Sequence, residues 1–236
     1  MADDQLSVIQ MSDPHLHPDK PDVMAGWHAA VQRAQRYKPD LIIITGDLTD
    51  DGRDQPDLTR FARAELDKLP WPVHTVPGNH DVGNKASHAN APVTAEMVDA
   101  WCDIVGGDRF RVDGGGWRLI GLDSQIIGSG LPREAQQTDW LTGELNACAA
   151  EGLRPAVFMH MPLFVRDPRD QFDDDSSYWP IDREPRAAML GLLDAAKVGL
   201  LANGHVHWHQ RTTIAGREYV WCPPVQKVFV DDPQFR

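Results

Sequence analysis

Unbroken runs of aliphatic residues that end abruptly at a polar side chain are the main feature of the hydrophobic pattern. The clearest run is Leu41–Thr45, which is followed directly by Gly46 and Asp47. A run without polar alternation is typical of a strand covered on both faces, as in α/β proteins. Ligands of such sheets gather beyond the carboxyl ends of the strands, so we expect Asp47 to lie where chemistry takes place. By itself, Gly-Asp after a strand is also what an ordinary turn contains.

The same pattern recurs along the chain and alternates with the spacing of amphipathic helices. It predicts further strands over residues 6–12, 72–76, 155–160 and 198–202, and hairpins over 109–123 and 211–221. Helices are predicted over residues 26–38, 58–69, around 98–105, 134–150 and 185–196. Alternating strands and helices at the start imply right-handed crossovers and a parallel or mixed sheet. The polar stretch 161–184 is long for a loop in a compact domain, which is typical of a functional or mobile segment.

Length and composition indicate one domain and narrow the choice of partners. The 236 residues, 42% of them hydrophobic, suffice for one sizeable core. The net charge of −12 and the lack of a basic block predict no binding to a nucleic-acid polymer. A small anionic substrate requires a local positive charge, such as a metal ion, to outweigh this field. The three cysteines lack CxxC spacing, so neither a disulfide framework nor a thiolate zinc site is predicted.

The sequence has no basic leader followed by an apolar segment, and no apolar stretch approaches about eighteen residues. We therefore expect a cytoplasmic protein without membrane contact. A homodimer is left open.

Oxygen and nitrogen donors stand at the ends of five predicted strands. They are Asp13, His15, Asp47, Asn79, His80, His160, His205 and His207. This donor set favours Mn²⁺, Fe or Zn²⁺ and argues against soft-metal or iron–sulfur chemistry. It is too large for one tetrahedral site but suits two ions that share a bridging carboxylate. A single loop histidine is far more often solvated than a ligand, but the recurrence of the pattern in order argues against coincidence.

The motifs that carry these donors resemble the signature of the calcineurin-like metallophosphoesterase superfamily. They are Asp13-x-His15, Gly46-Asp47-x-x-Asp50, Gly78-Asn79-His80-Asp81, His160 before Met-Pro, and Gly204-His205-x-His207. The resemblance spans roughly residues 8–230. It implies an α/β fold, a four-layer αββα sandwich of two mixed β-sheets flanked by helices, as a single domain over residues 1–236.

The resemblance also implies the cofactor and the roles of the residues. Two divalent or mixed-valence ions of Mn, Fe or Zn would be bound. Asp13, His15 and His207 would hold one ion, Asn79, His160 and His205 the other, and Asp47 would bridge them. His80 would be the general acid or transition-state donor and not a ligand, and Asp50 the carboxylate that orients it.

Two departures from related enzymes bear on the substrate. Where the protein phosphatases have Asp-Arg-Gly this chain has Asp50-Asp51-Gly52, and Gly83 stands where a second arginine would follow. A phosphodiester carries one negative charge and needs this arginine clamp less than a dianionic monoester does. Purple acid phosphatases place a tyrosine ligand at the position of Asp50, so an iron–tyrosinate centre is not expected. The chain is most similar to the bacterial class III cyclic-nucleotide phosphodiesterases.

The predicted function is hydrolysis of a small phosphodiester, such as a cyclic nucleotide or a glycerophosphodiester, by a hydroxide that two metal ions activate. The alternative is a phosphomonoesterase or nucleotide pyrophosphatase that uses the same dinuclear site. A catalytically silent scaffold is the rival from another class, but silence normally shows as lost ligands, and here none is missing.

Several further residues are candidates for the surroundings of the site. In extended geometry His17 and His209 would also face the metals. Trp179 and Trp208 are candidates for a wall against which the substrate stacks. Arg53, Arg166 and Arg169 are the arginines that loops could bring to the substrate.

Overall fold

The strands and helices predicted from the sequence are present in the computed structural model, which describes residues 5–88, 90–166 and 178–225. In chain order the elements are β1 (Val8–Met11), α1 (Pro21–Tyr37), β2 (Leu41–Thr45), α2 (Pro56–Leu66), β3 (Val73–Val76), α3 (Asn79–Val82), α4 (Ala95–Val105), β4 (Phe110–Gly114), β5 (Trp117–Leu122), α5 (Pro132–Glu151), β6 (Arg154–Met159), α6 (Arg183–Ala195), β7 (Leu200–Asn203), β8 (Gln210–Ile214) and β9 (Arg217–Trp221).

Helix boundaries depart from the predicted ones where a proline or a motif decides them. The first helix begins at Pro21, five residues before the predicted start, because proline has the φ angle and the missing N–H that suit a first turn. The short helix α3 was not predicted. It begins just after Gly78, whose backbone N–H is bound by the Asp81 carboxylate at 2.9 Å. The predicted loop 161–184 ends earlier, since α6 begins at Arg183; its residues 167–177 lie outside the described residues.

Two sheets form the centre of the molecule. The smaller has the order β1-β2-β3 with parallel pairing throughout, and Ile44 lies opposite Met11 and Thr75. The larger has the order β4-β5-β6-β7-β9-β8, with the antiparallel pairs β4–β5 and β8–β9 at its edges. Of the two sheets, which were both predicted to be mixed, the larger is mixed, and the smaller is parallel over the described residues.

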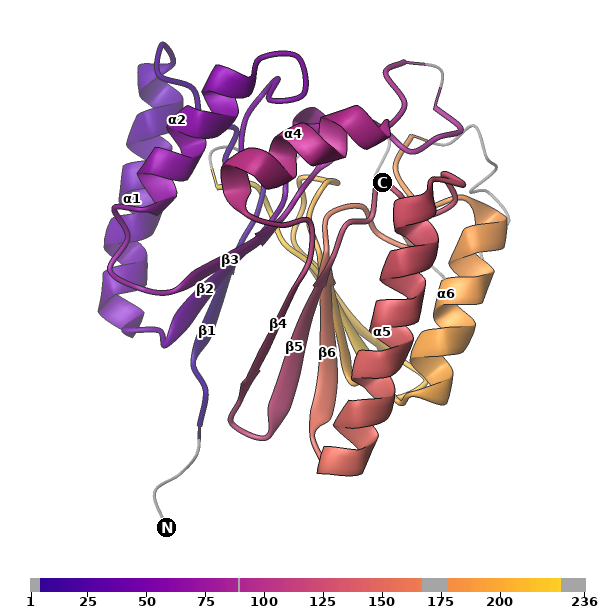
Figure 1. Ribbon diagram of the computed structural model, residues 1–236. Coiled ribbons are helices and arrows are strands. Elements are labelled where there is room, and N and C mark those ends of the chain that lie inside the picture. Colours follow the sequence, from indigo (N-terminus) through magenta and orange to yellow (C-terminus); the bar gives the residue numbers. More distant parts are fainter. Residues whose placement is uncertain (1–4, 89, 167–177, 226–236) are drawn as a thin grey trace.

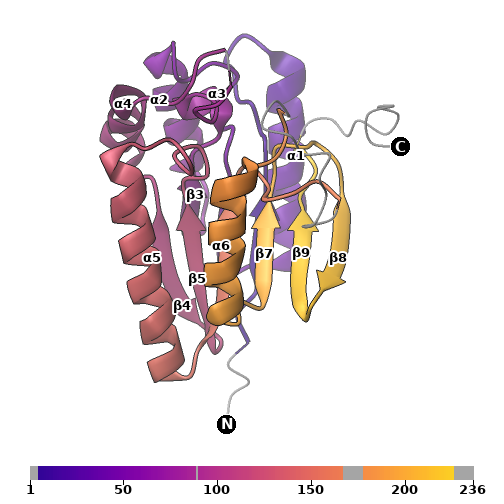
Figure 2. The ribbon, with the colours of Figure 1, turned by 90° about the vertical axis from the view of Figure 1, so that its right-hand side faces the viewer.

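Helices cover the outer faces of both sheets and complete the four predicted layers (Figure 1). Successive side chains of β2 point to opposite faces of the smaller sheet. Ile42 and Ile44 pack in the cluster that also holds Trp27 of α1 and Trp101 of α4. The intervening residues Leu41 and Ile43 face the other sheet, in a cluster with the inward side chains Leu119, Ala156, Phe158 and Ala202. Helices α5 and α6 cover the far side of the larger sheet (Figure 2).

The strand directions bring several carboxyl ends to one end of the molecule. Figure 2 shows β7 and β9 running the same way and β8 the opposite way, in line with their parallel and antiparallel pairing. The pairs β5–β6 and β6–β7 are also parallel. The loops that follow β5, β6, β7 and β9 are therefore neighbours.

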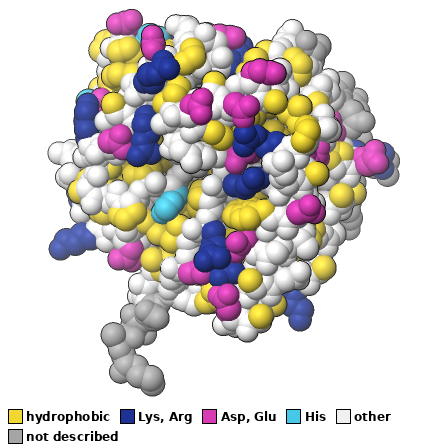
Figure 3. All heavy atoms as spheres, in the orientation of Figure 1, with side chains coloured by type: hydrophobic (Ala, Val, Ile, Leu, Met, Phe, Trp, Pro, Cys, Tyr) yellow, Lys and Arg dark blue, Asp and Glu magenta, His cyan; other side chains and the backbone are white. Residues whose placement is uncertain are grey.

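None of the helices described is both long and apolar enough to span a membrane. On the face shown in Figure 3, basic and acidic side chains are interspersed. This distribution leaves no broad basic area on that face for a nucleic-acid polymer.

A buried acid at the end of β5 makes the stability of the fold depend on pH. Asp123 is fully buried, and burial together with the charge of Asp108 raises its pKa to about 8. Its Oδ1 accepts a hydrogen bond from the Gln125 backbone N–H at 2.9 Å, whereas Oδ2 has no partner among the described residues. The folded chain therefore keeps a proton that the unfolded chain releases from about pH 4 upwards.

We predict that Asp123→Asn removes this pH dependence. Because the folded pKa is raised, the stabilising contribution is complete below the unfolded pKa and is lost as the pH rises toward 8. The free energy of unfolding of the wild type should fall relative to the variant by at most about 1.4 kcal/mol per pH unit in this range. Urea unfolding of the metal-free wild type and variant at pH 5 and pH 8 measures this difference in unfolding free energy. The control is Asp139→Asn, which removes an exposed carboxylate of α5. A difference between Asp123→Asn and wild type that is equal at both pH values contradicts the prediction.

Candidate metal centre

All the predicted donors meet at the carboxyl ends of five strands. The smaller sheet delivers its donors from the loops after β1 and β2 and from the start of α3 after β3, and the larger sheet from the loops after β6 and β7. The loop after β1 continues the parallel pairing beyond the sheet: the His15 backbone N–H donates to the Asp47 carbonyl oxygen at 3.0 Å. The loops after β1 and β2 therefore lie side by side beyond the sheet, and their side chains extend from the same edge.

The backbone is strained where these side chains meet. Nine non-glycine residues among those described have a positive φ, and five of them are predicted ligands: Asp13, His15, Asp47, His205 and His207. Left-handed backbone is unfavourable for residues with a Cβ and persists only where the surroundings enforce it. Strain of this kind gathers at functional sites, as it does here.

Two glycines allow backbone amides to approach the buried carboxylates. A Cβ at Gly78 would lie 2.2 Å from Asp47 Oδ1, and one at Gly204 would lie 2.6 Å from Asp13 Oδ2. Close by, the backbone N–H of His80 donates to Asp47 Oδ1 at 2.9 Å, and that of His205 donates to Asp13 Oδ2 at 3.2 Å. The glycines in the motifs are thus explained by close packing around the two carboxylates.

The donor atoms form two groups that share one carboxylate. In the first group, His207 Nε2 lies 3.1 Å from Asp13 Oδ1 and 3.4 Å from His15 Nε2, which is 3.9 Å from Asp47 Oδ2. In each group the donor atoms lie within 4.8 Å of one another; the members are Asp13, His15, Asp47 and His207 in the first and Asp47, His160 and His205 in the second. Asp47 belongs to both.

The second group also includes an amide oxygen. His160 Nε2 lies 3.3 Å from Asp47 Oδ2 and 3.0 Å from Asn79 Oδ1. His160 Nδ1 lies 2.8 Å from the Thr45 carbonyl oxygen, which requires that this nitrogen carry a proton. His160 therefore directs Nε2 at the shared carboxylate.

The metal-free chain balances its buried carboxylates with protonated histidines. Burial opposes ionisation of Asp47, but the charge of His160 lowers its pKa well below the ordinary value. Burial likewise opposes protonation of His15 and His160, but Asp50 and Asp47 raise the pKa of His15, and Asp47 that of His160, to about 9 each. A bound cation would replace these protons, because histidine ligates metals in its neutral form.

His205 is the direct indication that the residues fit a metal. Burial, and after it the charge of His160, lowers the pKa of His205 to about 3, so the ring is neutral. Its buried Nε2 has no hydrogen-bond partner among the described residues. A buried polar atom without a partner is uncommon and requires an explanation. Coordination supplies one, since imidazole, amide and carboxylate donors suit Mn, Fe and Zn ions.

Asp50 contacts His80 differently from the expectation. Its carboxylate lies 3.3 Å from His15 Nδ1 and also pairs with Lys20. His80 instead has its Nδ1 2.6 Å from the carbonyl oxygen of Asp50. The Asp50 backbone thus orients His80, and the carboxylate orients a predicted metal ligand.

Three residues near the centre were missed by the sequence reasoning. Lys20 is one, and its contact with Asp50 depends on an exposed side chain that no motif marks. Asp81 was quoted only as part of a motif. Its carboxylate accepts hydrogen bonds from the backbone N–H groups of Gly78, Leu48 and Thr49 at 2.9, 3.1 and 3.3 Å. Asp81 therefore ties the loop after β2 to the loop after β3, and its place next to His80 in the motif was the available signal.

Tyr178 is the third missed residue. Its hydroxyl lies 3.0 Å from Asn79 Nδ2, and its ring centroid is 5.0 Å from that of His205. Burial and the charge of Asp47 raise the pKa of Tyr178 to about 12. Tyr178 lies 99 residues after Asn79 in the chain, so no local spacing connects the two.

The other candidates lie around the two groups. Neither His17 nor His209 belongs to either group, and His209 is exposed. The Trp179 ring lies 5.4 Å from that of His205, and both Trp179 and Trp208 pack against the core cluster of the larger sheet. Arg53 pairs with Asp54 at 2.9 Å and with Asp51 at 3.8 Å. Arg169 lies outside the described residues.

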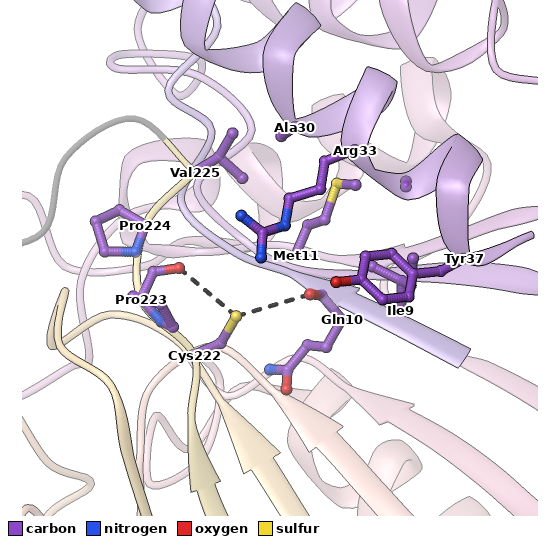
Figure 4. A pocket seen from close by; sticks show the side chains of 11 residues that line it. Ile9, Gln10, Met11, Ala30, Arg33, Tyr37, Cys222, Pro223, Pro224 and Val225 are labelled. Carbon is purple, nitrogen blue, oxygen red and sulfur yellow. Dashed lines mark hydrogen bonds between the residues drawn. The ribbon is translucent and has the colours of Figure 1, made fainter. Parts of the chain in front are cut away.

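A separate pocket of about 540 Å³ lies between α1, β1 and residues 222–225 (Figure 4). Its lining is largely apolar, and none of the predicted ligands contributes to it. Figure 4 shows Cys222 directed at the carbonyl oxygens of Gln10 and Pro223, with Sγ–O distances of 3.8 and 3.6 Å. The pocket is therefore distinct from the donor cluster.

The family model for calcineurin-like phosphoesterases matches residues 6–209. The chain belongs to this family. The matched range contains every donor of the two groups together with His80 and Asp50, so the predicted superfamily is confirmed.

Two relatives within the family carry different activities in their names. The chain is 32% identical over 181 residues to the mouse serine/threonine-protein phosphatase CPPED1, a match that covers 72% of this chain and 54% of that protein. It is 30% identical over 217 residues to the 3′,5′-cyclic adenosine monophosphate phosphodiesterase CpdA of Pseudomonas aeruginosa, covering 87% and 71%. The chain thus spans about half the length of the mouse phosphatase.

A solved structure supports the fold. The crystal structure of a dimetal phosphatase from Danio rerio aligns with a TM-score of 0.66 at 16% identity, over 94% of this chain and 88% of that one. The chain therefore shares the fold of this dimetal phosphatase, and the predicted arrangement of two sheets flanked by helices is confirmed.

We predict that metal binding to this family member releases protons. At pH 7 His15 and His160 are protonated in the metal-free chain, so loading with Zn²⁺ should release about two protons per chain, and the affinity should increase as the pH rises toward 9. Calorimetric titrations in buffers of different ionisation enthalpy count the protons. His160→Gln should release about one fewer, whereas the exposed-histidine control His209→Ala should match the wild type. Heats that do not depend on the buffer contradict the prediction.

Proposed function

We propose that the chain is a metal-dependent phosphodiesterase that hydrolyses a small phosphodiester, such as a cyclic nucleotide or a glycerophosphodiester. The observation that carries the proposal is the pair of donor groups that share Asp47, with His80 held beside them. The phosphodiesterase named among the relatives supports this reaction class. The phosphatase named among them supports the alternative, a phosphomonoesterase on the same site.

We assign the ligands by the two groups. Asp13, His15 and His207 would hold one ion, Asn79, His160 and His205 would hold the other, and Asp47 would be shared by both. When bound, the two ions supply Lewis-acid activation of the attacking water and positive charge against the phosphoryl oxygens.

The residues behind the ligands fix their orientation. His160 is turned by the Thr45 carbonyl oxygen, and His15 by the Asp50 carboxylate, so each presents Nε2 to the centre. Such contacts fix the tautomer of the histidine, and their removal typically lowers metal affinity by about 10- to 100-fold. Lys20 holds Asp50 in turn. Asp50 is therefore a positioning residue in this proposal, through its carboxylate for His15 and through its carbonyl for His80.

His80 is the proton donor to the leaving group in this proposal. Its Nδ1 is bound to the Asp50 carbonyl oxygen and its ring meets that of His15 edge to face, with centroids 5.0 Å apart. The Asp50 carbonyl oxygen requires a proton on Nδ1, so His80 donates from Nε2 as the imidazolium cation, which gives its Nε2 proton to the departing alkoxide and becomes neutral. His80 is half-buried, so it can reach substrate.

A diester is favoured because the motif arginines are absent. Asp51 and Gly83 stand at their positions, and Arg53 is engaged by Asp54 and Asp51. A dianionic monoester therefore finds no arginine clamp at the positions where related phosphatases have one.

We predict that His80→Ala slows turnover by about 10²–10⁴ for substrates with an alkoxide leaving group and leaves metal content intact. The defect should shrink for p-nitrophenolate, which leaves without protonation. Steady-state kinetics with both kinds of diester, alongside metal analysis, test this. His28→Ala, which removes a histidine with a 65% exposed side chain on α1, is the control. An equal defect for both leaving groups shows that His80 is not the proton donor.

We also predict a preference for diesters. The kcat/KM for bis-p-nitrophenyl phosphate should exceed that for p-nitrophenyl phosphate by roughly tenfold or more, which corresponds to about 1.4 kcal/mol. Both rates are measured on the same metal-loaded preparation at one pH. A clear preference for the monoester supports the phosphomonoesterase alternative instead.

A further inference from the structure

Asn79 fixes the direction of the hydrogen bond to Tyr178. The amide directs Oδ1 toward His160 Nε2 at 3.0 Å, so Nδ2 faces the Tyr178 hydroxyl, also at 3.0 Å. An amide NH₂ group only donates, and the phenol oxygen must therefore accept. The hydroxyl keeps its own proton for another partner. Asn79 is its one hydrogen-bond partner among the described residues.

Aromatic contacts hold the Tyr178 ring beside the second donor group. Its centroid lies 5.0 Å from His205, 4.9 Å from Trp179 and 5.2 Å from His88. Asn79 and His205 beneath it are 2% and 3% exposed, whereas Tyr178 itself is half-buried. The phenol thus stands at the rim of the centre and is more exposed than the two donors that it contacts.

A hydrogen-bond donor at this rim could bind a phosphate oxygen of the substrate that the metal ions leave without a partner. A phosphate group held by two ions still presents a non-bridging oxygen, and the motif arginines that would bind it are replaced by Asp51 and Gly83. A phenol has an ordinary pKa of about 10 and is neutral at pH 7, so it offers a hydrogen bond without adding charge. A neutral donor is sufficient for a monoanionic diester.

We propose that Tyr178 binds substrate. Its phenol oxygen accepts a hydrogen bond from Asn79, and its O–H group donates a hydrogen bond to a non-bridging oxygen of a phosphodiester bound at the group of Asp47, His160 and His205. The inference rests on the proposed function and adds a specificity-determining residue to it. It assigns to a side chain outside all five motifs the place that arginines hold in the related phosphatases.

The test measures binding as well as turnover. Dimethyl phosphate, a monoanionic diester, is titrated calorimetrically into the Mn²⁺-loaded full chain. Tyr178→Phe keeps the ring contacts and removes only the hydroxyl, and we expect its dissociation constant to rise roughly 10- to 100-fold, as for a lost hydrogen bond to a charged group. Tyr37→Phe removes the hydroxyl of an exposed tyrosine on α1 and should equal the wild type. The Mn²⁺ affinity of Tyr178→Phe, titrated separately, should stay within about twofold, and KM should rise more than kcat falls.

Three results would overturn the inference, and they are distinguishable. Equal affinities of wild type and Tyr178→Phe for dimethyl phosphate show that the hydroxyl does not touch substrate. A loss of Mn²⁺ affinity that accounts for the weaker binding shows that Tyr178 only positions Asn79. If the wild-type, Mn²⁺-loaded chain binds neither dimethyl phosphate nor inorganic phosphate, the proposed function fails and the inference fails with it.

Discussion

The burial of one carboxylate shapes the whole centre. Asp47 is 1% exposed at the end of the middle strand of the smaller sheet. A buried charge is strongly unfavourable unless it is paired and hydrogen-bonded. The fold meets this requirement from three directions, with the His80 backbone N–H from α3, His15 from the loop after β1 and His160 from the larger sheet. Without these partners the strand could not end in a charge at this depth.

This constraint couples the two sheets electrostatically as well as through packing. Hydrophobic residues such as Ile43 and Phe158 fill the space between the sheets, and their attraction is non-directional. The contact between His160 Nδ1 and the Thr45 carbonyl oxygen fixes β6 against the end of β2, and that between His207 and Asp13 fixes the loop after β7 against β1. Polar contacts of defined direction thus set the relative position of the sheets to the precision that a metal centre requires.

The sequence predicted the parts of the fold that depend on local pattern. The run Leu41–Thr45 predicted a buried strand, which the structure contains, and a polar residue directly after such a strand was expected at the carboxyl end of the sheet. It could not predict contacts made by the backbone or by distant loops. Whether Asp50 uses its carboxylate or its carbonyl oxygen depends on a turn geometry that residue types do not specify. Tyr178 reaches Asn79 from a segment without periodicity, and a helix start at Pro21 precedes the first apolar residue of its stripe.

Charge balance gives a physical reason for the choice between the two substrate classes. In the proposed enzyme two divalent ions meet the carboxylates of Asp13 and Asp47, while the charge of Asp50 is offset by Lys20. Counting only these two ligand carboxylates and an attacking hydroxide, the centre would retain one formal positive charge. A diester monoanion brings it to neutrality, whereas a monoester dianion leaves an excess negative charge in a largely buried site, where screening by salt is weak. Phosphatases correct this excess with arginine. This chain has a net charge of −12 and no arginine at the motif positions, and the hydrogen bond proposed for the Tyr178 hydroxyl would add a donor without adding charge.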